Sequence, residues 1–272
     1  MDAKDVGYEV DGRVALVTLN RARYRNAQSW RLLDQLDEAL DAAQADQEVR
    51  VVVVRGEGEH FSAGHDLGTP EQIEDLRERG VPAVGIAEYE AFRKYNLDLT
   101  LKWRNLPKPT VAMVRGYCIY GGWMIAAAMD VIFASPSARF LAGQVEYLSA
   151  PFDVGFRKAK ELLFESRFID AEEARGLGFV NRVIDDESLE QETLAWAHRV
   201  GETGYGNLRM AKLAVNKMQD LVGFSAAMEA AFADYLVVAR MGGHPAKPPS
   251  KRRLGGVDLA LKGSRGERAG QE

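Results

Sequence analysis

The sequence predicts an α/β protein, because short β-type runs alternate with stretches of helical periodicity up to about residue 185. The clearest strand is 51–54, four consecutive valines, a pattern expected of a strand covered on both faces of a sheet. The clearest helix follows Ser29, a typical N-cap residue, and carries leucines at helical spacing. Beyond residue 185 the pattern is helical almost to Met241.

The remaining elements follow from turn residues and periodicity. Asp11 and Gly12 form a hairpin signal between two strands, 6–10 and 14–19. Pro70 begins a helix, since proline is tolerated in a first turn. Further helices are predicted at about 86–103, 122–129, 158–164 and 171–176, further strands at 111–114, 131–134 and 179–184, and irregular chain at 140–156.

Composition limits the class of protein. The chain has 272 residues, 46% of them hydrophobic, which is enough for one large domain or for one domain plus an appendage. A net charge of -5 does not suggest nucleic acid or an anionic membrane as a partner. The single cysteine, Cys118, precludes an intrachain disulfide and fits a cytoplasmic location. We see neither a secretory signal nor a run of ~20 apolar residues, so we expect a soluble protein.

Two glycine-rich turns organise the chain. HFSAGHDLG (60–68) follows the valine strand, and RGYCIYGGW (115–123) follows the strand at 111–114. Two such strand–turn units can bring main-chain N–H groups to one point, which is the design of an oxyanion hole. The second donor would also lie at a helix N-terminus, where the helix dipole favours an anion. The alternative is that both are merely tight turns.

Taken in order, several segments resemble the crotonase superfamily, also called the enoyl-CoA hydratase/isomerase family. The resemblance covers roughly residues 6–240. The matching segments are RNAQS (25–29), VRVVVVRGEGEHFSAGHDL (49–67), PKPTVAMVRGYCIYGGWMIAAAMDVIFAS (107–135) and KELLFESRFIDAEEARGLGFVNRVI (160–184), followed by a helical C-terminal part.

The resemblance implies a crotonase (ClpP-like) spiral of ββα units with a helical C-terminal region. We expect the α/β core at 1–200 and a helical trimerisation region at 201–241. The segment 242–272 is rich in glycine, proline and charge, which predicts a mobile tail. The family also implies a homotrimer or a dimer of trimers.

The family binds an acyl-CoA thioester, whose carbonyl oxygen two backbone N–H groups hold. By resemblance these donors are the amides of His65 and Gly121. Coenzyme A is then part of the substrate, and we expect no separate cofactor. No metal-ligand spacing is visible among the histidines and aspartates. The imidazole of His65 either takes part in acid–base chemistry or only fills space.

The acid–base residues depart from the hydratase pattern. Family hydratases carry a glutamate three residues after the second glycine, where this chain has Met124, and a thioether cannot transfer the proton. A direct count places Gln144 at the second glutamate position. The nearest carboxylates are Glu146, our first candidate base, and Asp153, our second. Either is alternatively an ordinary loop acid.

Ligand contacts are assigned by the same resemblance. The residues expected to contact coenzyme A are Arg23 and Arg25 at its phosphates, Ala27 through its main chain, and Ala63, Asp66 and Leu67 beside the adenine. The tyrosines Tyr117, Tyr120 and Tyr147 either donate hydrogen bonds or line an acyl tunnel with Trp123 and Phe152.

The sequence therefore predicts an enoyl-CoA hydratase/isomerase-like enzyme of fatty-acid or related acyl-CoA metabolism, which stabilises a thioester enolate. Because of Met124, two alternatives stay open. One is a non-catalytic acyl-CoA-binding protein. The other is a hydrolase of a thioester or a carbon–carbon bond on the same scaffold.

Overall fold

The main sheet has six strands in the order β1-β2-β3-β4-β6-β9. The computed structural model describes residues 4–80, 84–143, 146–241 and 261. The strands are β1 (Val6–Asp11), β2 (Val14–Leu19), β3 (Val51–Gly56), β4 (Thr110–Val114), β6 (Val131–Ala134) and β9 (Arg182–Val183). Only β1 runs antiparallel to its neighbour. The predicted hairpin is confirmed, with Gly12 at φ 57° in its turn.

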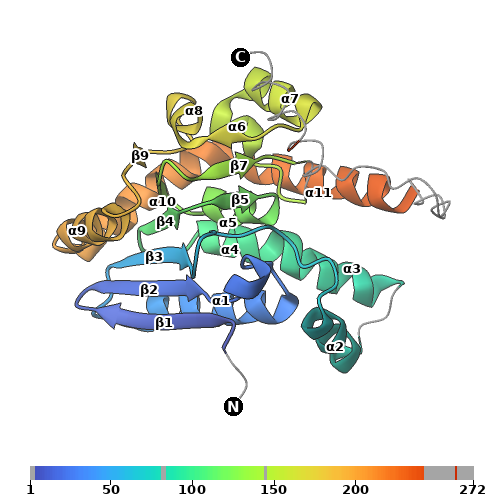
Figure 1. Cartoon of the computed structure of the whole chain (residues 1–272), viewed down its shortest axis with the longest axis horizontal. Coiled ribbons are helices and arrows are strands. Elements are labelled where there is room, and N and C mark those ends of the chain that lie inside the picture. The colour runs from blue at the N-terminus through green and yellow to red at the C-terminus, as the bar shows by residue number, and fades with distance from the viewer. Residues whose placement is uncertain (1–3, 81–83, 144–145, 242–260, 262–272) are drawn as a thin grey trace.

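A smaller sheet lies beside the main one. It contains β5 (Tyr117–Ile119), β7 (Arg139–Leu141) and β8 (Ile169–Asp170), in the order β5-β7-β8. Strands β5 and β7 pair in parallel. The two sheets lie one above the other in Figure 1, with helix α5 (Gly121–Ala128) beside β5. This arrangement makes the α/β prediction correct.

The valine strand is central and contributes to two cores. Strand β3 pairs with β2 on one side and β4 on the other, and 51–54 is fully buried. Because successive side chains point to opposite faces, Val52 and Val54 join the main core, and Val51 and Val53 join a second one under α9 (Leu189–Gly201). The prediction of a strand covered on both faces is confirmed.

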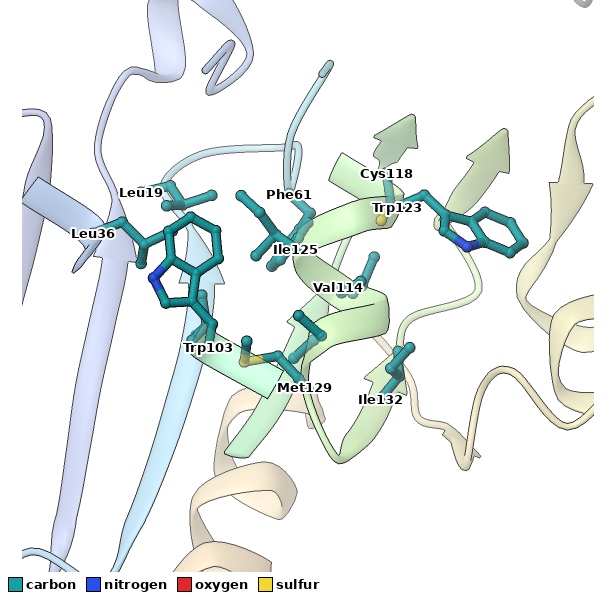
Figure 2. Packing of buried hydrophobic residues seen from close by; sticks show 14 of the residues in the cluster. Leu19, Leu36, Phe61, Trp103, Val114, Cys118, Trp123, Ile125, Met129 and Ile132 are labelled. Carbon is teal, nitrogen blue, oxygen red and sulfur yellow. The ribbon is translucent and has the colours of Figure 1, made fainter. Parts of the chain in front are cut away.

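Helix α1 (Trp30–Ala45) packs its leucines into the main core. The Ser29 side chain accepts a hydrogen bond from the Leu32 amide at 3.1 Å, as the predicted N-cap requires. Leu36 of α1 and Trp103 of α4 (Leu99–Arg104) face Ile125 of α5 (Figure 2). Helix α5 is therefore held in the core along its length.

The predicted helix at 86–103 is interrupted by a wider turn. Helix α3 (Ile86–Arg93) passes into a π-helical turn, η2 (Lys94–Asp98), before α4 begins. In η2 the side-chain amide of Asn96 donates to the Phe92 carbonyl at 2.8 Å. This side-chain bond lies where α3 passes into the π turn. Helix α2 (Pro70–Arg79) precedes these elements; it begins at Pro70, as predicted, and is capped by Gly80.

The prediction of irregular chain at 140–156 was wrong. The segment contains part of β7 and a short helix, α6 (Ala150–Val154). The carbonyl of Ser149 accepts the amides of Phe152 and Asp153, so a single turn forms that is too short to show periodicity. Helices α7 (Phe156–Glu165) and α8 (Ala171–Gly176) follow, and the strand predicted at 179–184 is reduced to β9.

The C-terminal region consists of helices, as predicted. Helices α10 (Tyr205–Leu221) and α11 (Phe224–Met241) follow α9. Helix α11 inserts Phe224, Met228 and Phe232 into an apolar cluster with Met124. Trimer contacts by these helices stay a prediction, and the predicted tail lies outside the described residues apart from Leu261. Between residues 4 and 241, no helix that the structure describes combines the length and apolarity needed to cross a bilayer.

Gly122 sets how closely the second turn approaches the first. A Cβ atom at this position would lie 2.5 Å from the Ser62 carbonyl oxygen, inside contact distance. We expect Gly122→Ala to lower the free energy of unfolding by about 1–3 kcal/mol, because a main-chain atom cannot move aside. Urea unfolding measures this change.

Gly206 provides the matched control, since an added Cβ there meets nothing within 4 Å. Gly206→Ala is expected to stabilise helix α10 by roughly 0.5–1 kcal/mol. Equal losses of stability in the two variants would contradict the proposed packing at Gly122.

Candidate active site

The two glycine turns pair with each other through their main chains. The Ser62 amide donates to the Tyr117 carbonyl at 2.9 Å, and the Ile119 amide donates to the Ser62 carbonyl at 3.1 Å. An isolated parallel bridge between Ser62 and Cys118 records this pairing. The end of the first turn and the start of α5 are consequently brought to one place.

Gly64 and Gly121 lie against each other at this junction. Gly64 has φ 89°, and a Cβ atom there would lie 3.3 Å from the Gly121 nitrogen and 2.8 Å from the Ile119 oxygen. A Cβ atom on Gly121 would lie 2.5 Å from Oε1 of Gln28 and 3.1 Å from Cε1 of His65. Gly64 requires glycine, because its φ is positive and a main-chain oxygen blocks a side chain, whereas at Gly121 the Gln28 side chain would have to move. Residues 65 and 121 are therefore neighbours.

The directions of the His65 and Gly121 amides follow from their main-chain neighbours. The main-chain amide of Gln28 donates to the Gly64 carbonyl at 2.8 Å, and the main-chain carbonyl of Gln28 accepts from the Asp66 amide at 3.0 Å. In this parallel pairing the amide of His65, which lies between the two bonded residues, faces away from Gln28. Gly121 is the first residue of α5, where an amide has no partner inside the helix. Among the described residues, neither amide donates a hydrogen bond to another protein group.

The imidazole of His65 lies beside Glu146. Nε2 of His65 is 3.5 Å from Oε2 of Glu146, which is a long separation for a hydrogen bond. Within the described part of the chain, both of these atoms are buried without a hydrogen-bond partner. Glu146 is only 3% exposed, which argues against an ordinary loop acid. Gln144 lies outside the described residues.

Glu146 remains ionised despite its burial. Burial raises the pKa of Glu146, but the neighbouring His65, the Glu146 amide and the phenol of Tyr235 together lower it by more. The pKa therefore lies below the ordinary glutamate value. A buried carboxylate that is ionised at neutral pH can accept a proton from a ligand carbon. Tyr235 comes from α11, and no local pattern in the sequence marks it.

Asp153, the second candidate, faces elsewhere. Its Oδ2 accepts hydrogen bonds from Nε1 of Trp123 at 2.8 Å and from Oγ of Ser149 at 2.7 Å. It also lines a cavity of about 400 Å³ between α5, α9 and α10, to which neither His65 nor Glu146 contributes. Burial raises the pKa of Asp153 to about 6, although both hydrogen bonds oppose the rise. The structure does not bring Asp153 together with the two amides.

Met124 is surrounded by apolar side chains. It is 2% exposed and belongs to the α11 cluster, whose other buried members are Leu97, Tyr147, Phe224, Met228 and Phe232. The Tyr147 hydroxyl is buried without a partner among the described residues, and burial followed by the charge of Asp153 raises its pKa. Trp123 instead stacks on Phe179 at 4.0 Å. The carboxylate that hydratases carry at position 124 thus has no substitute there.

The residues predicted to contact coenzyme A surround the first turn. Arg23 pairs with Glu71, and Arg25 is exposed in the left-handed region at φ 52°. The Ala63 amide donates to the Arg25 carbonyl at 2.9 Å, and Leu67 is 98% exposed. These positions flank the first turn, and their role in binding stays a prediction.

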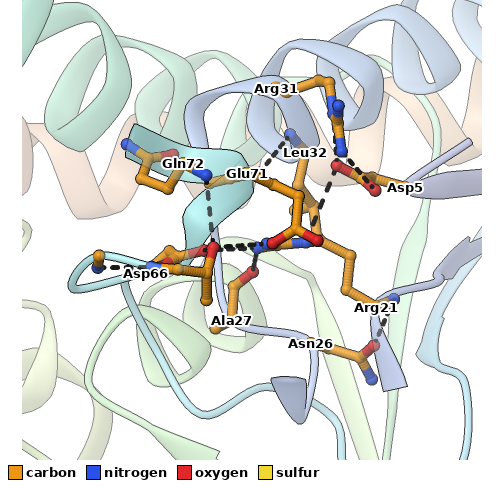
Figure 3. Close-up of polar contacts among 12 residues, drawn as sticks. Asp5, Arg21, Asn26, Ala27, Arg31, Leu32, Asp66, Glu71 and Gln72 are labelled. Carbon is orange, nitrogen blue, oxygen red and sulfur yellow. Dashed lines mark hydrogen bonds and ion pairs between the residues drawn. The ribbon is translucent and has the colours of Figure 1, made fainter. Parts of the chain in front are cut away.

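Asp66 supports the turn with its side chain. Its carboxylate accepts from the Gly68 and Thr69 amides at 3.0 and 2.8 Å, and from Nη1 of Arg21 at 2.9 Å. Burial raises the pKa of Asp66, but these bonds bring the pKa below the ordinary value. Arg21 also donates to the Ala27 carbonyl at 2.5 Å, which ties the RNAQS segment to the same network (Figure 3). Sequence reasoning missed Arg21.

The fold is that of a crotonase-fold protein, in which the first glycine turn lies against the second at the start of a buried helix. Residues 9–236 match the family model described as enoyl-CoA hydratase/isomerase. The chain therefore belongs to the enoyl-CoA hydratase/isomerase family, and the resemblance inferred from its motifs is confirmed. Members of this family process acyl-CoA thioesters.

Some relatives are named as hydratases and others as isomerases. A Mycobacterium tuberculosis protein with an enoyl-CoA hydratase name, EchA13, is 36% identical over 248 residues, covering 82% of this chain and 76% of that protein. The crystal structure of a probable enoyl-CoA hydratase from Mycobacterium thermoresistibile is 39% identical, with a TM-score of 0.75 and coverage of 84% and 94%. A monofunctional enoyl-CoA isomerase from Mycobacterium smegmatis is 28% identical, with a TM-score of 0.64 and coverage of 80% and 95%.

The raised pKa of Asp153 predicts a pH-dependent stability. The pKa of Asp153 is about 6 in the folded protein and exceeds the ordinary value of 3.8. The protonated side chain therefore contributes its full share to the free energy of unfolding below pH 4, and this share declines as the pH rises to 6. Asp153→Asn, which does not titrate, should gain stability relative to wild type over this interval. The expected gain is about 3 kcal/mol, measured by urea unfolding at pH 4, 5, 6 and 7.

Asp185→Asn makes the same change from carboxylate to carboxamide at an exposed position and is the control. A stability difference between Asp153→Asn and wild type that does not change with pH would contradict the prediction.

Proposed function

We propose that the protein is an enoyl-CoA isomerase, which moves a carbon–carbon double bond within an acyl-CoA thioester using one carboxylate, Glu146. The observation that carries this proposal is the pairing of Glu146 with His65 beside Gly121, while Met124 and Asp153 contribute no second proton-transfer group there. One carboxylate is sufficient for an isomerisation, because the reaction neither adds nor removes water.

In this proposal the two amides hold the thioester oxygen. The N–H groups of His65 and Gly121 stabilise the negative charge that develops on that oxygen when a proton leaves the adjacent carbon. A donor of this kind contributes about 3–4 kcal/mol to a transition state. The position of Gly121 at the start of α5 adds the favourable end of the helix dipole.

Glu146 carries the proton between two carbons. Its carboxylate takes a proton from C2 of a 3-enoyl thioester, and the electron pair moves into a dienolate whose charge rests on the thioester oxygen. The protonated Glu146 then returns the proton to C4, and the double bond forms between C2 and C3. Its low pKa keeps Glu146 in the accepting form at neutral pH.

Hydration is the second candidate, favoured by the names of the M. tuberculosis and M. thermoresistibile relatives. It needs a positioned water as well as groups that activate it and protonate carbon. The apolar surroundings of Met124 do not supply such a group. The similarity to the M. smegmatis isomerase supports the simpler reaction.

The test is turnover of 3-enoyl-CoA, followed by the ultraviolet absorbance of the conjugated 2-enoyl product. Wild type should form the 2-enoyl thioester without releasing free coenzyme A. Glu146→Gln should lower kcat by about 10²–10⁴-fold, because a carboxamide cannot accept the proton. Asp153→Asn is the matched control and should retain most activity, since it removes another buried carboxylate.

The other outcomes separate the alternatives. Accumulation of 3-hydroxyacyl-CoA from a 2-enoyl substrate would identify a hydratase. Release of free coenzyme A would identify a thioester hydrolase, and chain-cleavage products a carbon–carbon hydrolase. Saturable binding of acyl-CoA without any product would identify a non-catalytic acyl-CoA-binding protein. Each of these results would contradict the isomerase proposal.

A further inference from the structure

The cavity of about 400 Å³ that Asp153 borders lies apart from the two glycine turns. Its lining residues come from α4, α5, α6, α9, α10 and α11, and they include neither His65 nor Glu146. On α5 they are Ala127 and Ala128, at the opposite end of the helix from Gly121. Small-molecule sites have volumes of about 300–1,000 Å³, so this cavity is large enough to hold a ligand of its own.

The walls of the cavity are mostly apolar. The rings of Trp196 from α9 and Phe224 from α11 border it, together with Leu208 of α10. Ala211 and Val215, about one turn apart on α10, also line the cavity, and both are exposed. The mouth of the cavity therefore lies along α10, where a ligand with an apolar body can enter.

The two cations in these walls are each balanced by an acid. Nζ of Lys212 lies 2.8 Å from Oδ2 of Asp130, and its side chain is only 7% exposed. Nη1 of Arg104 lies 3.2 Å from Oδ1 of Asp220. Neither Lys212 nor Arg104 therefore brings an uncompensated positive charge to the cavity.

Asp153 is the charge in the cavity that lacks a counterion. Its partners within the described part of the chain are two neutral donors, Nε1 of Trp123 and Oγ of Ser149, and both bond Oδ2. Oδ1 accepts no hydrogen bond from a described residue, and it is not among the fully enclosed atoms. The side chain is partly exposed because it borders the cavity, so Oδ1 is the atom that a ligand can reach.

We propose that this cavity binds a small organic cation, a protonated primary amine on an apolar body, whose ammonium group pairs with Oδ1 of Asp153. An ionised carboxylate without a cation is costly in an enclosed place, and the ligand's ammonium group removes this cost. An anion would meet the same negative charge, and a neutral ligand would leave that charge unpaired. The site goes beyond the proposed isomerisation and does not depend on it.

Binding of the cation should depend on pH. The pKa of Asp153 is about 6, so the carboxylate is charged at neutral pH and becomes neutral as the pH falls through this value. Lys212 and Arg104 face the cavity from α10 and α4, each beside its own acid. Burial raises the pKa of the nearby Tyr147 phenol, which therefore stays neutral. We expect the affinity for an amine to fall about tenfold between pH 7.5 and pH 5.

The test is a titration of the full chain with 2-phenylethylamine, followed by the indole ¹⁵N–¹H NMR signals of its four tryptophans. The Trp196 signal, assigned by its loss in Trp196→Phe, should shift saturably. The matched probes 2-phenylethanol and phenylacetate have nearly the same shape without the positive charge, and each should bind at least about tenfold more weakly.

Two variants separate the charge from the cavity. Asp153→Asn keeps the size of the side chain and removes the charge, so it should weaken amine binding by about 10–100-fold and abolish its pH dependence. Ala211→Phe places a ring at the mouth and leaves Asp153 intact, and it should weaken binding of the amine and of 2-phenylethanol alike. Asp185→Asn is the control and should bind the amine like wild type.

Three results would overturn the inference. One is equal affinity of Asp153→Asn and wild type for the amine. Another is binding of phenylacetate as tight as that of 2-phenylethylamine. The third is a Trp196 signal that no probe shifts, which is the result expected if a second copy of the chain covers the mouth or if only water occupies the cavity.

Discussion

The contact between the two glycine turns is the constraint on which the rest of the structure depends. Ser62 pairs with the strand that precedes the second turn, and Gly122 packs α5 onto the Ser62 carbonyl. The amides of His65 and Gly121 come together as a consequence, through main-chain atoms alone. Side chains around them can therefore differ between members of the family while the pair of amides is retained.

Two buried acids lie near α5, and their surroundings give them opposite properties. Glu146 is held ionised by an imidazole and a phenol, whereas burial dominates at Asp153 and makes it a weaker acid. Met124 fills apolar space in the α11 cluster. In the proposed isomerisation, proton transfer therefore falls to Glu146 alone, which suits a reaction that returns the same proton to the substrate.

Much of the fold could be predicted from sequence, because hydrophobic periods and glycine turns report on local structure. The Ser29 cap, the valine strand and the C-terminal helices are examples. Helix α6 and the π turn were missed, since one turn carries no period. His65 and Glu146 were found singly, but their pairing and the approach of Tyr235 depend on tertiary packing, which no local pattern encodes.

The ion pair of Arg21 with Asp66 has a consequence for the history of this chain. Both side chains are almost fully enclosed, at 2% and 1% exposure. Loss of Arg21 leaves the enclosed Asp66 carboxylate without its cation, whereas loss of Asp66 leaves Arg21 paired with Asp5, whose Oδ2 lies 3.8 Å from Nε. Selection should therefore act more strongly on the codon for Arg21 than on the codon for Asp66.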